Sequence, residues 1–219
     1  MKTYLVTGAN KGIGKELCRK LKQQGNTVIA VCRSSNQELE GLGVRVESGV
    51  DISNMDDLKR LTEKLQGVTI DVLINNAGIW KNESLDDMNF DTILEQFQVN
   101  TLGTLKVTSC LLPLLTSGSK VAVVTSRMGS IEDNTSGGRY GYRMSKAALN
   151  SAAKSLSVDL KEKQIAVGIL HPGMVQTDMT SHRGIPVEES VSGLLQRIEE
   201  LNLENTGTFW HANGEILPW

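Results

Sequence analysis

Short runs of aliphatic and β-branched residues alternate along the chain with longer segments in which apolar residues recur every three or four positions. The short runs are typical of buried strands, and the longer segments are typical of amphipathic helices. In the first such pair, residues 3–7 (TYLVT) predict a strand, and residues 12–25 predict a helix with Ile13, Leu17 and Leu21 on one stripe. Gly25 would end that helix, because glycine is common just past a helix C-terminus.

The same alternation continues along the rest of the chain. Further strands are predicted at 27–31, 44–48, 71–78, 120–126, 165–170 and 207–212, and further helices at 55–67, 90–115, 142–163 and 187–202. The run at 71–78 (DVLINNAG) lacks polar alternation, as expected for a strand buried on both faces. Strands interleaved with helices favour right-handed βαβ units. We therefore expect an α/β fold, a Rossmann-like, doubly wound parallel sheet flanked by helices on both faces.

Length and charge limit the classes of protein. The 219 residues suit one domain, and no repeat or low-complexity linker divides them, so residues 1–219 are expected to form a single domain. Lys and Arg number 23 against 25 Asp and Glu. That balance offers no basic field for nucleic acid or for an anionic membrane surface.

The cysteines and apolar runs bear on localisation. Cys18, Cys32 and Cys110 are odd in number and far apart in sequence, which suits free thiols in a reducing compartment. The N-terminal apolar run is too short for a signal-peptide core, and no run approaches the ~18 apolar residues of a membrane span. A cytoplasmic protein without a membrane partner is expected.

A glycine cluster follows the first predicted strand directly. In TGANKGIG, residues 7–14, glycines stand at 8, 12 and 14, just ahead of the first helix. Glycines at such a place allow a tight turn and a close approach of the backbone to a pyrophosphate, and the N–H groups of the helix N-terminus favour anions. In open parallel sheets ligands bind beyond the carboxyl ends of the strands, so this turn predicts a dinucleotide site.

Two tyrosines lie close to a lysine in GRYGYRMSK, residues 138–146. Tyr142 and Lys146 are four residues apart, side by side on one helix face, whereas Tyr140 and Lys146 are six apart and point in different directions. An ammonium ~4–5 Å away would favour the phenolate by roughly 3–4 kcal/mol, enough to bring the pKa of Tyr142 down by two to three. Tyr142 is therefore the expected proton donor.

Six motifs stand in one order along the chain: TGANKGIG, NNAG at 75–78, Asn100 in VNTLG, Ser126 in TSRMG, YRMSK at 142–146 and PGMVQTD at 172–178. In this order and rough spacing they resemble the short-chain dehydrogenase/reductase family. The segment TGTFWHANGEILPW at 206–219 is similar to the small C-signal-factor and sniffer-type carbonyl reductase subgroup.

The resemblance implies a division of roles among four side chains. Tyr142 would be the general acid, and Lys146 would tune it and hold the nicotinamide ribose. Ser126 would bind the substrate carbonyl and the oxyanion that it becomes. Asn100 would hold a distorted helical turn and a water that links to Lys146.

The resemblance also implies a set of cofactor-binding positions. Asp51 and Ile52 would flank the adenine, the NNAG segment would lie under the adenosine ribose, and Thr177 with the Val175 backbone would bind the carboxamide. The full expected set is Gly8, Asn10, Lys11, Gly12, Ile13, Gly14, Arg33, Asp51, Ile52, Asn76, Ala77, Gly78, Tyr142, Lys146, Pro172, Gly173, Val175 and Thr177.

The charge after the second strand indicates which dinucleotide is bound. NAD-preferring sites usually have a carboxylate there, but VCRSS offers Cys32 and then Arg33. The Arg33 guanidinium suits a 2′-phosphate, and Lys11 would add a second cation, although both could equally be solvated surface charges. NADP(H) is the expected cofactor.

The expected activity is NADPH-dependent reduction of a ketone or aldehyde to an alcohol. Alternatives are alcohol oxidation, enoyl reduction, and a cofactor-binding signalling or redox-sensing protein whose catalysis is vestigial. A serine hydrolase is disfavoured, because VTSRMG lacks the Gly-x-Ser-x-Gly elbow. The three histidines lack metal-ligand spacing, so no catalytic metal is expected.

The substrate and the oligomeric state leave weaker signals. A substrate-side loop is expected at 177–187, with apolar candidates for the pocket wall at Trp80, Met128, Met174 and Met179. The short segment after Gly173 suggests small or flat carbonyl compounds. The resemblance allows a homodimer through the helices of Asn100 and Tyr142, for which the outer candidates are Leu105, Leu111, Leu149 and Leu156, unless these face the sheet.

Overall fold

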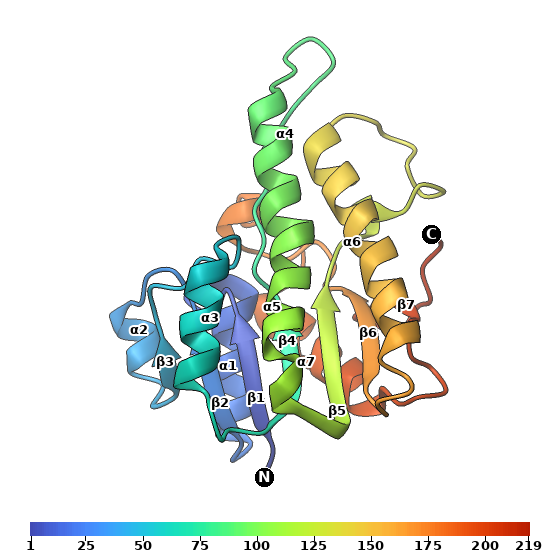
Figure 1. Ribbon diagram of the computed structural model, residues 1–219. Helices are drawn as coiled ribbons and strands as arrows, with labels where there is room; N and C mark the ends of the chain where they lie inside the picture. The colour runs from blue at the N-terminus through green and yellow to red at the C-terminus, as the bar shows by residue number, and fades with distance from the viewer.

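Seven parallel strands form one sheet in the computed structural model, which describes all residues from Met1 to Trp219 (Figure 1). The strands are β1 (Thr3–Thr7), β2 (Thr27–Val31), β3 (Arg45–Glu47), β4 (Ile70–Asn75), β5 (Leu115–Val124), β6 (Ala166–His171) and β7 (Phe209–His211). Their order across the sheet is β3-β2-β1-β4-β5-β6-β7. The direction of winding reverses between β1 and β4, where a crevice opens beyond the strand ends.

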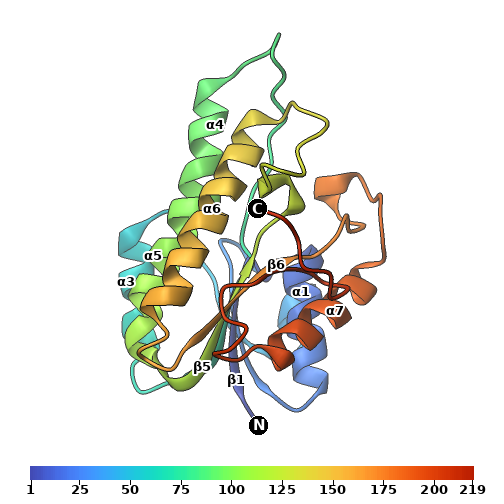
Figure 2. The same ribbon diagram turned by 90° about the vertical axis from the view of Figure 1, so that its right-hand side faces the viewer.

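Helices cover both faces of this sheet. They are α1 (Gly12–Gln23), α2 (Gln37–Glu40), α3 (Met55–Lys64), α4 (Phe90–Phe97), α5 (Thr104–Leu111), α6 (Tyr140–Asp159) and α7 (Val187–Glu200). Figure 2 shows α3, α5 and α6 on one side of the strands and α1 and α7 on the other. Four shorter helical segments join these elements: η1 (Gln98–Gly103), η2 (Leu112–Leu114), η3 (Arg127–Gly129) and η4 (Asp178–Thr180).

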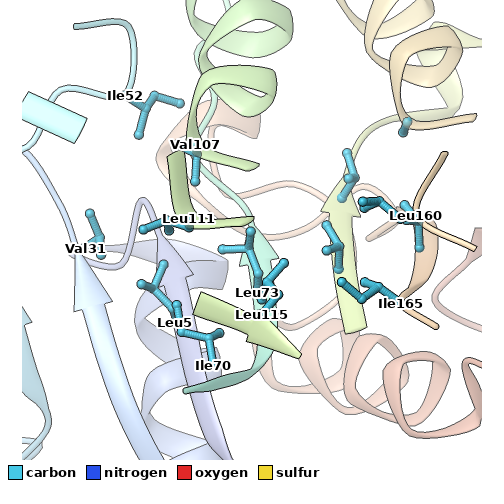
Figure 3. Packing of buried hydrophobic residues seen from close by; sticks show 14 of the residues in the cluster. Leu5, Val31, Ile52, Ile70, Leu73, Val107, Leu111, Leu115, Leu160 and Ile165 are labelled. Atoms are coloured by element: carbon cyan, nitrogen blue, oxygen red, sulfur yellow. The ribbon is translucent and has the colours of Figure 1, made fainter. Parts of the chain in front are cut away.

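Each face of the sheet carries its own hydrophobic core. Leu5, Leu73 and Val121 point from the strands toward α3, α5 and α6, where they join Val107 and Leu149 (Figure 3 shows part of this cluster). A second cluster buries the stripe of α1, including Leu17 and Leu21, against the opposite face together with α7. The strands are buried on both faces, which explains their lack of polar alternation.

Three of the helices begin with an asparagine cap. Asn36, Asn54 and Asn89 accept hydrogen bonds from first-turn amides of α2, α3 and α4. Such caps satisfy amides that have no partner within the helix. Helix α6 begins differently, after Arg139 in the left-handed region with φ 52° and without a side-chain cap.

The predicted α/β fold is confirmed, with changes at several boundaries. Residues 90–115 form no single helix, because η1 is a π-helical segment between α4 and α5 and η2 contains Pro113. Strand β5 begins at Leu115, earlier than predicted, since Leu115 pairs with Ile70 and the register then shifts. The short helix α2 was not predicted. None of the helices has the length and hydropathy needed to cross a lipid bilayer.

The leucines considered as an outer, dimer-forming face pack inward. Leu111 and Leu149 are fully buried against the sheet, and Leu156 packs against the same core. Leu105 is half-buried. Of the two interpretations that the sequence allowed, Leu111 and Leu149 therefore follow the one in which they face the sheet, and they provide no outer apolar surface.

Candidate active site

A cavity of about 880 Å³ lies beyond the carboxyl ends of β1, β2, β4 and β5. The glycine turn, the start of α6 and the segment after β6 complete its walls. A volume of this size is in the range of cofactor and substrate sites, and the place is the one that the reversal of strand order predicts.

The glycine turn is shaped by close backbone packing. Gly8 has φ +66°, and a Cβ there would lie 2.8 Å from the Cα of Ala77. A Cβ on Gly14 would lie 2.2 Å from the Gly8 carbonyl oxygen. Any larger residue at either position would push the start of α1 away from β4. The turn thus leaves the first amides of α1 open toward the cavity.

The NNAG segment locks the end of β4 to the end of β1. The Asn76 side-chain amide donates to the Thr7 carbonyl at 3.0 Å, and the Thr7 hydroxyl accepts from the backbone amides of Asn76 and Ala77. These bonds fix the floor of the cavity between the two strands.

Arg33 and Asp51 face the same end of the cavity. Burial disfavours the charged form of Asp51, but hydrogen bonds from Ser53 and the positive charges of Arg33 and Lys106 outweigh it, so the pKa of Asp51 is lowered. Arg33 is exposed and takes part in no ion pair with a carboxylate within 4.0 Å. A guanidinium that is free in this way fits a ligand phosphate.

Lys11 of the glycine turn forms an ion pair across the cavity wall. Its Nζ lies 3.0 Å from Oδ2 of Asp178, which belongs to the segment after β6. The bond lowers the pKa of Asp178. Both side chains are largely exposed, and exposed pairs of this kind contribute little to stability.

Asn100 lies within the π-helical segment η1 and is fully buried. Its side-chain oxygen accepts from the Ile79 amide at 2.8 Å, and its amide donates to the Ile79 carbonyl at 2.9 Å and to Ser145 Oγ at 3.0 Å. The residue therefore ties the segment after β4 to α6. The expected distorted helical turn is thus present at this position as a π-helical turn. Such turns are rare in proteins overall but occur frequently at functional sites.

Lys146 is buried one helical turn beyond Tyr142. Its Nζ donates to the Val124 carbonyl at 3.1 Å and lies 5.8 Å from the centre of the Tyr142 ring. Both side chains reach the cavity wall. The helical spacing thus places the two groups together, as predicted, while Tyr140 lies off this cavity.

The pKa values of this pair differ from the expectation. Burial raises the pKa of Tyr142 to about 12, and a hydrogen bond with Ser126 works only partly against it. Burial also lowers the pKa of Lys146 to about 8. The sequence argument considered the attraction between ammonium and phenolate but omitted the cost of burying each charge, and that cost dominates here.

Ser126 follows β5 directly and is 7% exposed. Its Oγ accepts from the Met128 amide at 3.1 Å, which caps η3, and its hydroxyl lies close enough to Tyr142 to lower the pKa of that phenol. No hydrogen bond joins Ser126 to any histidine. The arrangement needed to activate a serine nucleophile is therefore missing from this structure.

An aromatic and a cation extend the site outward from Tyr142. The Trp80 ring lies 6.1 Å from the Tyr142 ring, and the Arg139 guanidinium lies 5.8 Å from the centre of Trp80. Trp80 and Met179 line the cavity as expected for pocket-wall candidates, whereas Met128 and Met174 do not.

Most of the expected cofactor positions meet in this one cavity. Those on its wall are Gly8, Asn10, Lys11, Gly12, Ile13, Arg33, Asp51, Ile52, Asn76, Ala77, Gly78, Tyr142, Lys146, Pro172 and Thr177. Gly14, Gly173 and Val175 are set back from it, and so are Asn100 and Ser126. Val175 is buried and pairs with Ile185.

Several wall residues were not predicted from the sequence. They include Ile79, Lys81, Thr125 and Gln176. Gln176 stands within the PGMVQTD motif and could have been included. Thr125 follows β5 directly, and Ile79 and Lys81 lie in the segment after β4, where no local pattern shows which residues reach the wall.

Comparison with known proteins identifies the family. The family model described as short chain dehydrogenase matches residues 2–186. The chain belongs to the short-chain dehydrogenase family. It is accordingly an oxidoreductase, and the resemblance inferred from the six motifs is confirmed.

Two relatives within the family are similar over most or all of the chain. The 1-hydroxy-2-glutathionyl-2-methyl-3-butene dehydrogenase of Rhodococcus sp. (strain AD45) is 40% identical over 226 residues, 100% of both chains. The C-signal of Myxococcus xanthus is 47% identical over 156 residues, which cover 68% of this chain and 93% of the relative.

Solved structures of carbonyl reductases in the family share the whole fold. The carbonyl reductase Sniffer of D. melanogaster has a TM-score of 0.93 and 32% identity over 100% of both chains. The NADPH-bound carbonyl reductase from chicken fatty liver has a TM-score of 0.90 and 29% identity, covering 100% of this chain and 99% of that one. The predicted likeness to the C-signal and sniffer-type subgroup is thereby confirmed.

Proposed function

We propose that this protein reduces a ketone or aldehyde to an alcohol with NADPH, and that Tyr142 is the general acid. The observation that carries the proposal is the meeting of Tyr142, Lys146 and the glycine turn on the wall of one cavity, with the Ser126 hydroxyl close enough to Tyr142 to lower its pKa.

Tyr142, Ser126, Lys146 and Asn100 would divide the proton chemistry among them. NADPH, when bound, supplies the hydride. The Tyr142 hydroxyl keeps its proton across the physiological range, because its pKa is about 12, and so it can donate to the developing alkoxide. Ser126 would hold the same oxygen with a second hydrogen bond and stabilise its growing negative charge.

Lys146 and Asn100 would assist Tyr142 without contacting the substrate. With a pKa of about 8, Lys146 is mostly protonated at neutral pH, and its ammonium favours any negative charge that forms on the phenol oxygen. Asn100 holds Ile79 and Ser145, and through them keeps the cavity wall and α6 in register. Its role in the proposal is positioning.

The free guanidinium of Arg33 supports NADP(H) over NAD(H). Arg33 lies on the cavity wall beyond β2, at a point where the chain has no carboxylate to receive ribose hydroxyls. Lys11 would contribute its charge only in part, because it already pairs with Asp178. The NADPH-bound chicken carbonyl reductase has the same overall fold.

Residues 177–187 would form the substrate side of the cavity. Thr177, Asp178, Met179 and His182 from this segment lie on the wall, and a backbone pairing of Val175 with Ile185 closes its base. Together with Trp80, which lies on the same cavity wall, this segment would receive small or flat carbonyl compounds.

Alcohol oxidation is a second candidate, favoured by one observation. The Rhodococcus relative, similar over its full length, is named as a dehydrogenase of a hydroxy compound. The same four side chains would then run the reaction in reverse, with Tyr142 accepting the proton.

The test is cofactor turnover with defined variants. NADPH oxidation should be measured with a panel of isatins, quinones and aldehydes, and NADP⁺ reduction with the matching alcohols. Tyr142→Phe should lower kcat/KM by about 10²–10⁴-fold while keeping NADPH affinity. Tyr140→Phe, the matched control six residues from Lys146, should change kcat/KM by about twofold or less.

Two outcomes would overturn the proposal. Full activity in Tyr142→Phe would remove Tyr142 from the chemistry. NADPH binding without turnover of any carbonyl or alcohol would favour the alternative, a cofactor-binding signalling or redox-sensing protein with vestigial catalysis.

A further inference from the structure

Helix α6 carries Tyr142 and Lys146, yet its own sequence does not cap it. Arg139, at the N-cap position, has φ 52° and ψ 47°, and its guanidinium has no acceptor that could cap a first-turn amide. A residue other than glycine rarely adopts this left-handed conformation without a constraint from its surroundings. The first turn of α6 therefore depends on another part of the chain.

That other part is Glu83, in the segment between β4 and α4. Its carboxylate oxygen Oε2 accepts from the Gly141 amide at 3.2 Å, and its backbone carbonyl accepts from the Arg139 amide at 2.8 Å. Glu83 thus accepts hydrogen bonds from the backbone amides on either side of Tyr140. It lies 58 residues before Gly141 in the sequence. A carboxylate at this end of a helix also complements the helix dipole.

The second carboxylate oxygen of Glu83 binds α4. Oε1 accepts from Gln96 Nε2 at 2.7 Å and from the Thr92 hydroxyl at 2.8 Å. Glu83 is 2% exposed, and none of the ion pairs includes it. Burying a carboxylate without a cation is costly unless hydrogen bonds satisfy it. The hydrogen bonds to both oxygens therefore make Glu83 a structural link between α4 and α6, in contrast to a solvated charge on a loop.

The helices touch at the point that Glu83 holds. A Cβ on Gly141 would lie 2.4 Å from Gln96 Nε2 and 2.9 Å from the Cα of Ile93. One turn further along α6, Ser145 bonds Asn100. Figure 1 shows the first turns of α4 and α6 extending past the strand ends, where the sheet no longer supports them. Tyr142 thus lies between two points at which α6 is tied to its neighbour.

We propose that Glu83 is a positioning residue for Tyr142, an inference that rests on the reaction proposed above. Its carboxylate caps α6 and fixes the first turn against α4, which sets the distance of the phenol from Ser126 and Lys146. Glu83 does not touch the reacting atoms, and it acts through Tyr142.

Glu83→Gln is the principal test, because it keeps the size of the side chain. The NH₂ group of the new side chain must face either the Gly141 N–H or the Gln96 Nε2 group, and two donors cannot bond each other. One of these two hydrogen bonds is therefore lost. We expect kcat for carbonyl reduction to fall about tenfold to a hundredfold, as for other small misplacements of a reacting group, with NADPH Kd changed by less than about twofold.

A double-mutant cycle distinguishes positioning from general damage. In a Tyr142→Phe background, Glu83→Gln should cause no further loss of the residual rate, since it acts through the hydroxyl already removed. The exchanged pair Glu83→Gln with Gln96→Glu restores one carboxylate beside one amide and should recover most of kcat. Unchanged kcat in Glu83→Gln, or an equal loss in the Tyr142→Phe background, would overturn the proposal.

Two further variants guard the interpretation. Glu47→Gln changes another buried carboxylate, which pairs with Arg45 and Lys64 at the far edge of the sheet, and should leave kcat unchanged. Thr92→Val removes only one hydroxyl donor to Glu83 and should lower kcat about threefold. This milder variant tests the proposal even if Glu83→Gln fails to fold.

Amide hydrogen exchange separates this inference from the proposed function. In Glu83→Ala, which removes both side-chain acceptors, the Gly141 amide should exchange at least about tenfold faster than in the wild type, whereas amides in the middle of α6 should not change. If the wild type turns over no carbonyl or alcohol, the proposed function fails, and the exchange result still decides whether Glu83 holds this turn. Equal exchange in the two proteins would refute the cap.

Discussion

At the scale of single residues, burial governs the chemistry of Tyr142 and Lys146. Burial favours the uncharged form of each group, so it raises the pKa of Tyr142 to about 12 and lowers the pKa of Lys146 to about 8. The spacing of four residues correctly placed them together, but sequence spacing contains no information on how much water surrounds each group. A buried lysine is tolerated at a cost to stability, which enzymes commonly accept at active sites.

Lys146→Met should therefore stabilise the protein and abolish its turnover. Lowering the pKa of Lys146 from 10.5 to about 8 corresponds to about 3 kcal/mol against the charged form, and losing the bond to Val124 offsets about 1 kcal/mol. At pH 7 the variant should gain on the order of 2 kcal/mol in the free energy of unfolding, measured with urea.

The gain should depend on pH in a defined direction. Below pH 8 the folded wild type holds a buried ammonium and bears the full cost. Between pH 8 and 10.5 the folded lysine is neutral while the unfolded lysine still binds a proton, so wild-type stability rises with pH. The advantage of Lys146→Met should consequently shrink from pH 7 to pH 10. An advantage that grows over this interval would contradict the assignment.

At the scale of elements, the junction of α4, η1 and α6 was the least predictable part of the site. Apolar periodicity indicated one helix over 90–115, and only Asn100 hinted at an interruption, because asparagine is a poor helix former. Glu83 lies in WKNESLDDMN, which has the composition of a solvated loop. Its burial follows from tertiary packing between helices that are distant in sequence, and no local pattern contains that information.

Gly141→Ala should show how closely these helices are packed. Alanine is favoured over glycine within a helix by about 1 kcal/mol, but its methyl group would overlap Gln96 and Ile93. Overpacking typically costs about 1–3 kcal/mol, so we expect a net loss of stability of about 1 kcal/mol and a lower kcat. Thermal denaturation would measure the first and NADPH turnover the second.

Ser151→Ala is the matched control for that substitution. Ser151 is exposed on the same helix, and its replacement should leave stability within about 0.5 kcal/mol and kcat unchanged. A Gly141→Ala variant as stable as this control would show that α4 and α6 separate easily at their first turns.

At the scale of the whole molecule, the sequence predicted the fold well. Alternating runs specified a parallel sheet, and the glycine turn after β1 located the cavity, because both features depend on local pattern and on general rules of chain connection. The exact ends of the elements and the inward direction of Leu111 and Leu149 depend on tertiary packing, so they were harder to predict from the sequence. The binding of a dinucleotide should be visible at this same scale, as a change in global stability.

NADP⁺ should raise the melting temperature more than NAD⁺ does. At about 100 times its Kd, a ligand specific for the folded state adds about 2.7 kcal/mol, which for a chain of this length is a rise of about 5–10 °C. The same concentration of NAD⁺ should give a smaller rise. Arg33→Ala should remove the difference between the two, measured by differential scanning fluorimetry. Equal shifts in the wild type would contradict a preference based on Arg33.

The edges of the sheet have a consequence for how copies of this chain can associate. Each edge strand, β3 and β7, is only three residues long, and β7 is partly covered by an antiparallel bridge between Trp210 and Ile216. Short, covered edges offer little backbone for pairing with a strand of another molecule. Lateral growth of the sheet into fibrous assemblies is therefore disfavoured, and higher-order contacts between copies are left to side chains on the helical layers.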